Sequence, residues 1–403
     1  MTARATATIR SQRLNALPPY LFVEIDRAKR AKIASGADVI DLGVGDPDRP
    51  TPSFIIDALA EAARDPANHR YPPSIGTPGF RESAARFMKR RFGVDADPDR
   101  HICQCIGSKD GIAHLPLAVV DPGDVVLAPR PGYPVYQSGA AFAGAEVFDL
   151  RLAADTGWTP RLQDVPATIA SRAKLIWANY PNNPTAACVD VAFFERYIAF
   201  ADRHGIIAAS DLAYSEVWFD QPPPSMWQAD NADLDTTLGI EFHSLSKAFN
   251  MTGWRCAFAV GHPEVISALA AIKGNCDSGQ FGAIQHAGAV ALDHYDHPDV
   301  VAMRDVYRQR RDVVVPGLRE FGCAVENPRA GFFVWARCPP GPDGEPMDSM
   351  AFAARALEEA DVVLVPGAGF GPDAATFFRI ALTVEVDRLA EAMQRLKTID
   401  FRR

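Results

Sequence analysis

A lysine flanked by hydroxyl groups stands out in the second half of the chain. Lys247 follows an apolar, strand-like run, with Ser244 and Ser246 within three residues before it and Arg255 eight residues after it. A lysine enclosed between strands loses hydration, which lowers its pKa and leaves a free amine able to attack a carbonyl. Hydroxyl and guanidinium groups are donors that bind phosphate. The stretch predicts either a reactive amine beside a phosphate site or an ordinary surface lysine between two serines.

A carboxylate and a phenol follow another apolar run. Asp211 comes directly after residues 206–210, and Tyr214 lies three residues further on. The carboxyl ends of parallel strands border the ligand cleft of an α/β sheet. Buried there, Asp211 would stay ionised only opposite a cation such as a protonated pyridine nitrogen; its alternative role is a helix N-cap. Together with Lys247, it favours pyridoxal 5′-phosphate bound as a Schiff base.

Three further turns also follow apolar runs. The Gly-Ser108-Lys109 turn opens a helix, where free N–H groups and the helix dipole favour phosphate, although it is neither a P-loop nor a dinucleotide motif. Tyr133 could stack on a flat ligand or simply pack. Asn183 could bind a phenolate oxygen or close an Asx turn. Arg379 lies inside an apolar strand, where a carboxylate is the partner that best fits its geometry.

The elements that must position these residues alternate along the chain. Apolar strands are expected at 102–106, 124–128, 146–150, 174–178, 206–210, 238–243 and 256–260, and helices at 110–118, 191–203, 263–273 and 283–292. This alternation predicts an α/β fold with a mostly parallel sheet covered by helices on both faces. Three earlier helices are expected. The first covers residues 21–34 and the third covers residues 80–92. The second begins after Thr51 and places Ile55, Ile56, Leu59 and Ala63 on one face.

The last part of the chain predicts a smaller α+β domain. It combines expected helices at 300–320, 350–359 and 386–399 with short strands at 324–326, 332–336, 362–365 and 377–381. A chain of 403 residues exceeds one compact core. We expect residues 1–48 to form an N-terminal arm and the start of the small domain, 49–290 the large cofactor-binding domain, and 291–403 the small domain.

Composition limits the partners and the compartment. The net charge of −9 and the lack of a basic block argue against nucleic acid or an anionic membrane as a partner. No apolar run approaches the ~20 residues of a membrane span. Seven scattered cysteines favour buried thiols in a cytoplasmic protein over a metal site formed by His101, Cys103 and Cys105. The first thirteen residues favour a flexible arm over a targeting segment.

With these motifs in place, the chain resembles the fold type I pyridoxal-phosphate enzymes, and among them the class I/II aminotransferases, from about Leu14 onward. Ser-Leu-Ser-Lys247 with Gly-Trp-Arg255 is similar to the lysine signature of that family. The segments around Tyr20, Tyr71 and Lys247 most resemble those of the LL-diaminopimelate aminotransferases. The resemblance implies a ping-pong transfer of an amino group between an L-amino acid and a 2-oxo acid, with LL-diaminopimelate and 2-oxoglutarate as one possible pair.

The resemblance also implies a role for each cofactor residue. Lys247 would form the Schiff base and act as the base of the 1,3-proton shift. Asp211 would pair with the pyridinium nitrogen, Tyr214 and Asn183 would bind the 3′-oxygen, and Tyr133 would stack on the ring. The residues expected to hold the phosphate are Ser108, Lys109, Ser244, Ser246 and Arg255.

On the substrate side, Arg379 would take the α-carboxylate, helped by the Gly45 loop, with Tyr20 nearby. Tyr71 would reach the phosphate of the neighbouring subunit, which implies an obligate homodimer. Ile75 and Gly282 depart from the family pattern, because a glutamate and an amide are expected there. Without that glutamate and amide, the far ammonium and carboxylate of diaminopimelate would be unpaired, at a cost in binding free energy of ~1–3 kcal/mol per group.

Further departures and alternatives follow. Ala186 replaces a usual glycine, and Cys256-Ala257 follows Gly-Trp-Arg; both changes should adjust packing and leave the cofactor chemistry intact. The alternatives are an aminotransferase for another amino acid, such as aspartate, alanine or arginine or a substrate of specialised metabolism, and a pyridoxal-phosphate-dependent carbon–sulfur lyase. An aminotransferase-like sensor half of a transcription regulator is disfavoured, since no basic segment precedes Leu14.

Overall fold

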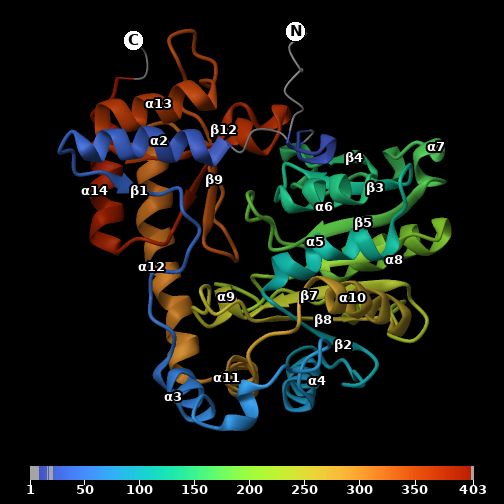
Figure 1. The fold of residues 1–403 in the computed structure, drawn as a ribbon. Coiled ribbons are helices and arrows are strands. Elements are labelled where there is room, and N and C mark those ends of the chain that lie inside the picture. The colour runs from blue at the N-terminus through green and yellow to red at the C-terminus, as the bar shows by residue number, and fades with distance from the viewer. Residues whose placement is uncertain (1–8, 16, 18–20, 401–403) are drawn as a thin grey trace, which may run out of the picture.

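The computed structural model describes residues 9–15, 17 and 21–400; Tyr20 and most of the expected N-terminal arm lie outside the described residues. A seven-stranded sheet in the order β2-β8-β7-β6-β5-β3-β4 forms the centre of the large part (Figure 1). Only β8 runs antiparallel to its neighbours, which confirms the expected mostly parallel sheet. The strands are β2 (Ile102–Cys105), β3 (Val125–Arg130), β4 (Glu146–Arg151), β5 (Ala173–Asn179), β6 (Ile207–Asp211), β7 (Gly239–Ser244) and β8 (Ala257–Gly261).

Helices cover both faces of this sheet because successive side chains of each strand point to opposite sides. On β5, Ile176 and Ala178 belong to the cluster that includes residues of α3 (Ser53–Ala62), α4 (Pro78–Phe92), α8 (Val191–His204) and α11 (Gly282–Asp293). Leu175 and Trp177 belong to the cluster with α5 (Ser108–Val119), α6 (Val135–Ala143) and α10 (Pro263–Cys276). The remaining short helices of this part are α1 (Gln12–Asn15), α7 (Ala167–Ala170) and α9 (Leu245–Ala248).

A smaller α+β part packs beside the large one. Its three-stranded antiparallel sheet has the order β11-β12-β9, with β9 (Phe333–Arg337), β11 (Val365–Pro366) and β12 (Phe377–Ala381). The strand β1 (Ile40–Asp41) pairs with β10 (Val362–Val363) in a separate parallel pair. Its helices are α2 (Leu21–Ala34), α13 (Ser349–Ala360) and α14 (Val386–Lys397).

The long helix α12 (Pro298–Glu320) spans both parts (Figure 1). It begins beside α3, where the rings of Phe54 and His297 lie 4.4 Å apart, and it packs on α14 at its other end. In α2, Lys32 forms an ion pair with Asp361. This contact and the β1–β10 pairing support the proposal that the start of the chain belongs to the small domain; the boundaries at 48 and 290 stay predictions.

Some expected elements were wrong in detail. The helix α6 was not predicted, and residues 324–326 form only an isolated bridge, Val325 to Ala336, in place of a strand. The expected strand 362–365 is divided between two sheets. Ile56 is exposed, since α3 buries its other side through Ile55 and Ala62. Across the described ranges, no helix is both long and apolar enough to cross a membrane.

Candidate active site

A cavity of about 560 Å³ lies at the carboxyl ends of β5, β6 and β7. The predicted residues that line it are Gly45, Ser108, Lys109, Tyr133, Asn183, Asp211, Tyr214, Ser244, Ser246, Lys247, Arg255 and Arg379. A larger crevice of about 1330 Å³ elsewhere contains none of them. Tyr71 does not line the cavity of its own chain, and its side chain is 88% exposed. The structure thus brings together the predicted residues that it describes, except Tyr71; Tyr20 lies outside the described residues.

Lys247 lies in the single turn of α9, between β7 and β8. Its Nζ donates a hydrogen bond to the carbonyl oxygen of Gly45 at 2.8 Å. Burial lowers the pKa of Lys247 from 10.5 to about 8; the charge of Asp46 opposes this, and the charges of Arg255 and Arg379 add to it. A lysine in this state has a substantial neutral fraction near pH 8, which is what a nucleophilic amine requires.

Asp211 ends β6 and is 4% exposed. Its Oδ2 accepts a hydrogen bond from the hydroxyl of Tyr136 at 2.8 Å, and the side-chain amide of Asn179 donates to its backbone oxygen at 2.8 Å. The other carboxylate oxygen, Oδ1, is buried and has no hydrogen-bond partner among the described residues. Burial raises the pKa of Asp211 to about 6, against the hydrogen bonds from the Tyr136 hydroxyl and the Ala213 backbone. Such an oxygen needs a donor or cation from a bound molecule to offset its desolvation.

An anion site borders the same cavity. The helix α5 begins at Ser108, and the N–H groups of Ser108 and Lys109 at its start have no acceptor within the helix, whereas that of Asp110 donates to the Gly107 carbonyl at 3.1 Å. Gly107 has φ 79°, and a Cβ there would lie 2.2 Å from Nη2 of Arg255. The Arg255 guanidinium therefore rests against the turn. Ser244 and Ser246 add hydroxyl groups; Ser244 Oγ also accepts from the Ser246 N–H at 3.3 Å.

Arg379 extends from β12 to the opposite wall and is 4% exposed. Its Nη1 donates to Asn183 Oδ1 at 2.8 Å, and its Nη2 donates to the carbonyl of Gly43 at 2.9 Å. The guanidinium also lies 4.2 Å from the ring centre of Phe333 and 5.2 Å from that of Phe370. These contacts fix a planar, permanently charged group at the cavity wall, which suits a carboxylate ligand.

Two predicted aromatic residues complete the wall. Tyr214 packs edge-on against Phe332, with ring centres 5.4 Å apart, and burial raises its pKa. The ammonium of Lys109 lies 5.8 Å from the ring centre of Tyr133. Tyr133 and Tyr136 meet edge-on at 6.1 Å.

Sequence reasoning missed Tyr136 as a site residue. Its position three residues after Tyr133, in the same segment, could have identified it. In the structure, α6 places its hydroxyl against the Asp211 carboxylate. It also missed the cluster formed by Asp110, His114 and Lys273 behind α5. Asp110 and His114 have the i,i+4 spacing of one helix face, but Lys273 lies 163 residues from Asp110, and no local pattern connects them.

The structure also bears on the alternative metal site and on the positions of Ile75 and Gly282. The alternative metal site is not assembled, because His101 accepts from the N–H of Asp97 through Nδ1 and lies 3.3 Å from Asp235 through Nε2. Neither Ile75 nor Gly282 lines this cavity. A Cβ at Gly282 would lie 2.6 Å from Asn68 Oδ1, so local packing there favours glycine.

The cavity fits the pyridoxal phosphate that the sequence predicts. An amine with a lowered pKa, an unpartnered buried carboxylate oxygen and an anion site all border one space, and these are the three groups that the cofactor's aldehyde, pyridine nitrogen and phosphate require. Lys247, Asp211 and the Ser108 turn would hold them.

The chain is also similar to known proteins over nearly its whole length. Residues 37–396 match the family model for aminotransferase class I and II. An LL-diaminopimelate aminotransferase of Aquifex aeolicus is 46% identical over 390 residues, which cover 96% of this chain and 98% of that protein. A substrate-bound BacF structure from Bacillus subtilis superposes with a TM-score of 0.90 at 35% identity, covering 97% of both chains. An aspartate aminotransferase mutant of Thermus thermophilus gives a TM-score of 0.89 at 28% identity, covering 96% of this chain and 99% of that one.

Proposed function

The chain belongs to the class I and II aminotransferases, which are pyridoxal-phosphate-dependent enzymes, and from this premise we propose how its own residues carry out amino transfer. The observation that carries the proposal is that Lys247, with its lowered pKa, lines the same cavity as the unpartnered Oδ1 of Asp211. When bound, the cofactor supplies an electron sink that labilises the substrate's Cα–H bond.

Each residue then has a defined task. Lys247 would hold the cofactor aldehyde, and its Nζ, with the lowered pKa, would be the base that moves the substrate Cα proton. Asp211 keeps a proton on the ring nitrogen through the oxygen that lacks a protein partner. Tyr214 and Asn183 bind the ring's hydroxyl oxygen, and Tyr133 supports the ring face.

Different residues of the cavity would hold the phosphate and the substrate carboxylate. Ser244, Ser246, Arg255 and the N–H groups of the Ser108–Lys109 turn bind the phosphate. Arg379 binds the substrate α-carboxylate, and the carbonyl of Gly43 with Asn183 Oδ1 holds its guanidinium in place. The Gly45 loop borders the same cavity, and the expected substrate role of Tyr20 stays a prediction from the sequence.

For the substrate pair we propose LL-diaminopimelate and 2-oxoglutarate. The support for LL-diaminopimelate is that similar proteins are LL-diaminopimelate aminotransferases, including one of Syntrophobacter fumaroxidans that is 46% identical over 98% of this chain and 100% of that protein. Ile75 and Gly282 favour the second candidate, an aminotransferase for another amino acid, because neither side chain can pair with the distal charges of diaminopimelate.

Half-reactions with single amino acids separate these candidates. The holoenzyme is mixed with LL-diaminopimelate, glutamate, aspartate, alanine or arginine, and the conversion of the cofactor to its pyridoxamine form is followed by absorbance. We expect conversion with LL-diaminopimelate and with glutamate. Conversion only with other amino acids would replace the substrate pair, and release of pyruvate and ammonia without the pyridoxamine form would indicate a lyase.

The proposal includes a homodimer in the cytoplasm. The exposed Tyr71, absent from its own cavity, supports a role across the interface, and the free state of all seven cysteines supports a reducing compartment. Mixing inactive Lys247→Ala with impaired Tyr71→Phe subunits tests the shared site. A mixed dimer should regain one complete site and therefore activity, whereas no recovery would place Tyr71 outside the partner's site.

A further inference from the structure

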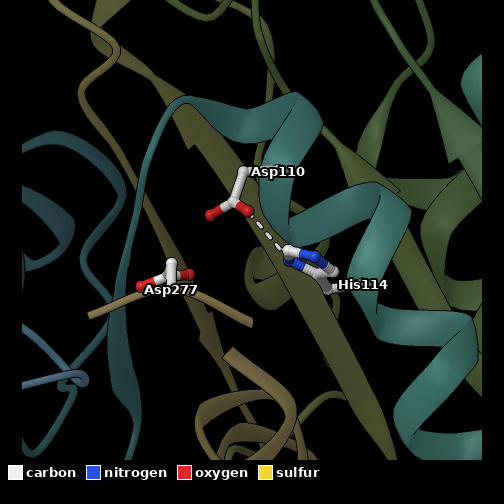
Figure 2. Close-up of side chains that lie close together, drawn as sticks. All are labelled: Asp110, His114 and Asp277. Atoms are coloured by element: carbon white, nitrogen blue, oxygen red, sulfur yellow. Dashed lines mark ion pairs between the residues drawn. The ribbon is translucent and has the colours of Figure 1, made fainter. Parts of the chain in front are cut away.

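A buried ion-pair cluster lies directly behind the phosphate turn. The side chain of Lys273, from α10, is fully buried, and its Nζ lies 2.5 Å from Asp110 Oδ2 and 2.8 Å from Asp277 Oδ2. Figure 2 shows Asp110 facing His114 from the preceding turn of α5, with Asp277 approaching from a separate segment. The Nδ1 of His114 lies 2.8 Å from Asp110 Oδ1.

These three acceptors resemble a metal site, but the protein already supplies their cation. Ligand atoms of Asp110, His114 and Asp277 lie within 4.8 Å of one another. The ammonium of Lys273 contacts both carboxylates, where a metal ion would be repelled. Burial works to lower the pKa of Lys273, but the neighbouring acidic groups, including Cys105 and Asp110, raise it above its usual value. Lys273 therefore stays protonated and positively charged although it is buried.

The cluster is connected to the phosphate turn through the backbone. Asp110 lies in the first turn of α5, and its Oδ2 also accepts a hydrogen bond from the N–H of Ile106 at 3.0 Å. This contact ties the end of the strand to the start of the helix across the residues that present their N–H groups. The position of the Ser108–Lys109 backbone thus depends on where Lys273 holds Asp110.

The charge of Asp110 also creates an electrostatic conflict. A carboxylate near a helix N-terminus interacts well with the helix dipole, but it repels a phosphate bound at the same place. The Lys273 ammonium, in contact with Asp110, offsets the charge of that carboxylate. Without Lys273, its charge would act on the bound phosphate across a poorly screened interior.

We propose that Lys273 is a positioning residue for the cofactor phosphate: through Asp110 it fixes the turn from Ile106 to Lys109 and cancels the repulsion between Asp110 and the phosphate. This inference rests on the proposed phosphate site at that turn. It predicts a defect that depends on the phosphate group, because Lys273 touches no other proposed part of the site.

Titration of the apoenzyme with two cofactor forms tests this dependence. Pyridoxal 5′-phosphate and pyridoxal differ only in the phosphate, and binding of each is followed by absorbance and protein fluorescence. Lys273→Met should weaken binding of pyridoxal 5′-phosphate by about tenfold or more, the equivalent of one charged hydrogen bond. Pyridoxal binding should stay within about twofold by the same reasoning.

Two further variants separate charge from general loosening. Adding Asp110→Asn to Lys273→Met should restore part of the affinity: the repulsion is gone and the amide oxygen can still accept from the Ile106 N–H, but the hold of Lys273 on the turn stays lost. Lys397→Met is the control, since it breaks a surface ion pair with Glu320 far from the turn. It should bind both cofactor forms as the wild type does.

The outcomes are distinct. Three results would each overturn the inference. Lys273→Met could lose affinity equally for pyridoxal 5′-phosphate and pyridoxal, it could lose no affinity at all, or the double variant could recover none of the lost affinity. If Lys273→Met does not fold, Asp110→Asn alone carries the test: it should keep or raise the preference for the phosphorylated cofactor, and a loss of that preference would overturn the inference. A wild-type protein that binds no pyridoxal 5′-phosphate would instead refute the proposed function.

Discussion

Replacing Asp211 by Asn should change how the stability of the apoprotein depends on pH. Burial raises the pKa of Asp211 from 3.8 to about 6. The folded apoprotein therefore holds a proton that the unfolded chain has already released, so this group lowers stability as pH rises from 3.8 to 6, and the loss persists above pH 6. A shift of about two pKa units corresponds to about 3 kcal/mol in total.

The variant lacks this titration. Between about pH 4.5 and pH 8, the stability of Asp211→Asn relative to the wild-type apoprotein should rise by about 2 kcal/mol, whatever constant cost the amide adds. Urea unfolding at both pH values, at one protein concentration, measures this difference. Pyridoxal 5′-phosphate added at pH 8 should stabilise the wild type more than the variant, because only the wild-type carboxylate pairs with the ring nitrogen.

Two results would refute this reasoning. An equal pH dependence in both proteins would mean that Asp211 is not a desolvated carboxylate. Equal stabilisation of both proteins by the cofactor would mean that Oδ1 does not meet the ring nitrogen. Tyr136→Phe is the matched variant: it removes the one side-chain donor to Asp211 and should raise the pKa of that carboxyl further.

Three further predictions concern other walls of the cavity. Cofactor attachment to the apoenzyme should accelerate about tenfold per pH unit at low pH and level off above about pH 8, following the lowered pKa of Lys247, as stopped-flow absorbance can show. Gly107→Ala should lower both the urea midpoint and the cofactor affinity, because φ is 79° and its Cβ would meet Arg255. Gly93→Ala, at φ 76° with open space around it, should cost only the backbone strain of about 1 kcal/mol. Arg379→Lys should raise the KM for the amino acid about 10- to 100-fold in steady-state assays, with cofactor affinity unchanged.

Each of these three predictions has a result that would contradict it. A plateau reached only near pH 10 would place Lys247 in solvent. Equal effects of the two glycine substitutions would remove Arg255 from the turn. A loss of cofactor affinity in Arg379→Lys would assign that arginine to the cofactor and not to the substrate.

Strand ends explain why so much of the site could be predicted. Asp211, Asn183 and Lys247 each follow an apolar run, and the parallel arrangement of β5, β6 and β7 brings the ends of such runs to one edge. The pattern of apolar residues therefore placed the chemistry as well as the sheet. The antiparallel direction of β8 left no local signal, since its apolar content is the same in either direction.

The site residues that the sequence did not predict are defined by contacts between distant segments. Tyr136 meets Asp211 across 75 residues, and Lys273 meets Asp110 across 163. Neither pair has a spacing that a helix or strand period would reveal. The strands β10 and β11, of two residues each, are shorter than any periodicity can define. Ile56 was misplaced because its helix is apolar on more sides than it buries.

The central claim is that Lys247 carries the cofactor. Reduction of the holoenzyme with borohydride converts a Schiff base to a stable amine, and peptide mapping by mass spectrometry then locates it. We expect a pyridoxyl-phosphate adduct on the peptide that contains Lys247, with none on Lys109 or Lys273. An adduct on a different lysine, or no adduct in a protein saturated with cofactor, would contradict it.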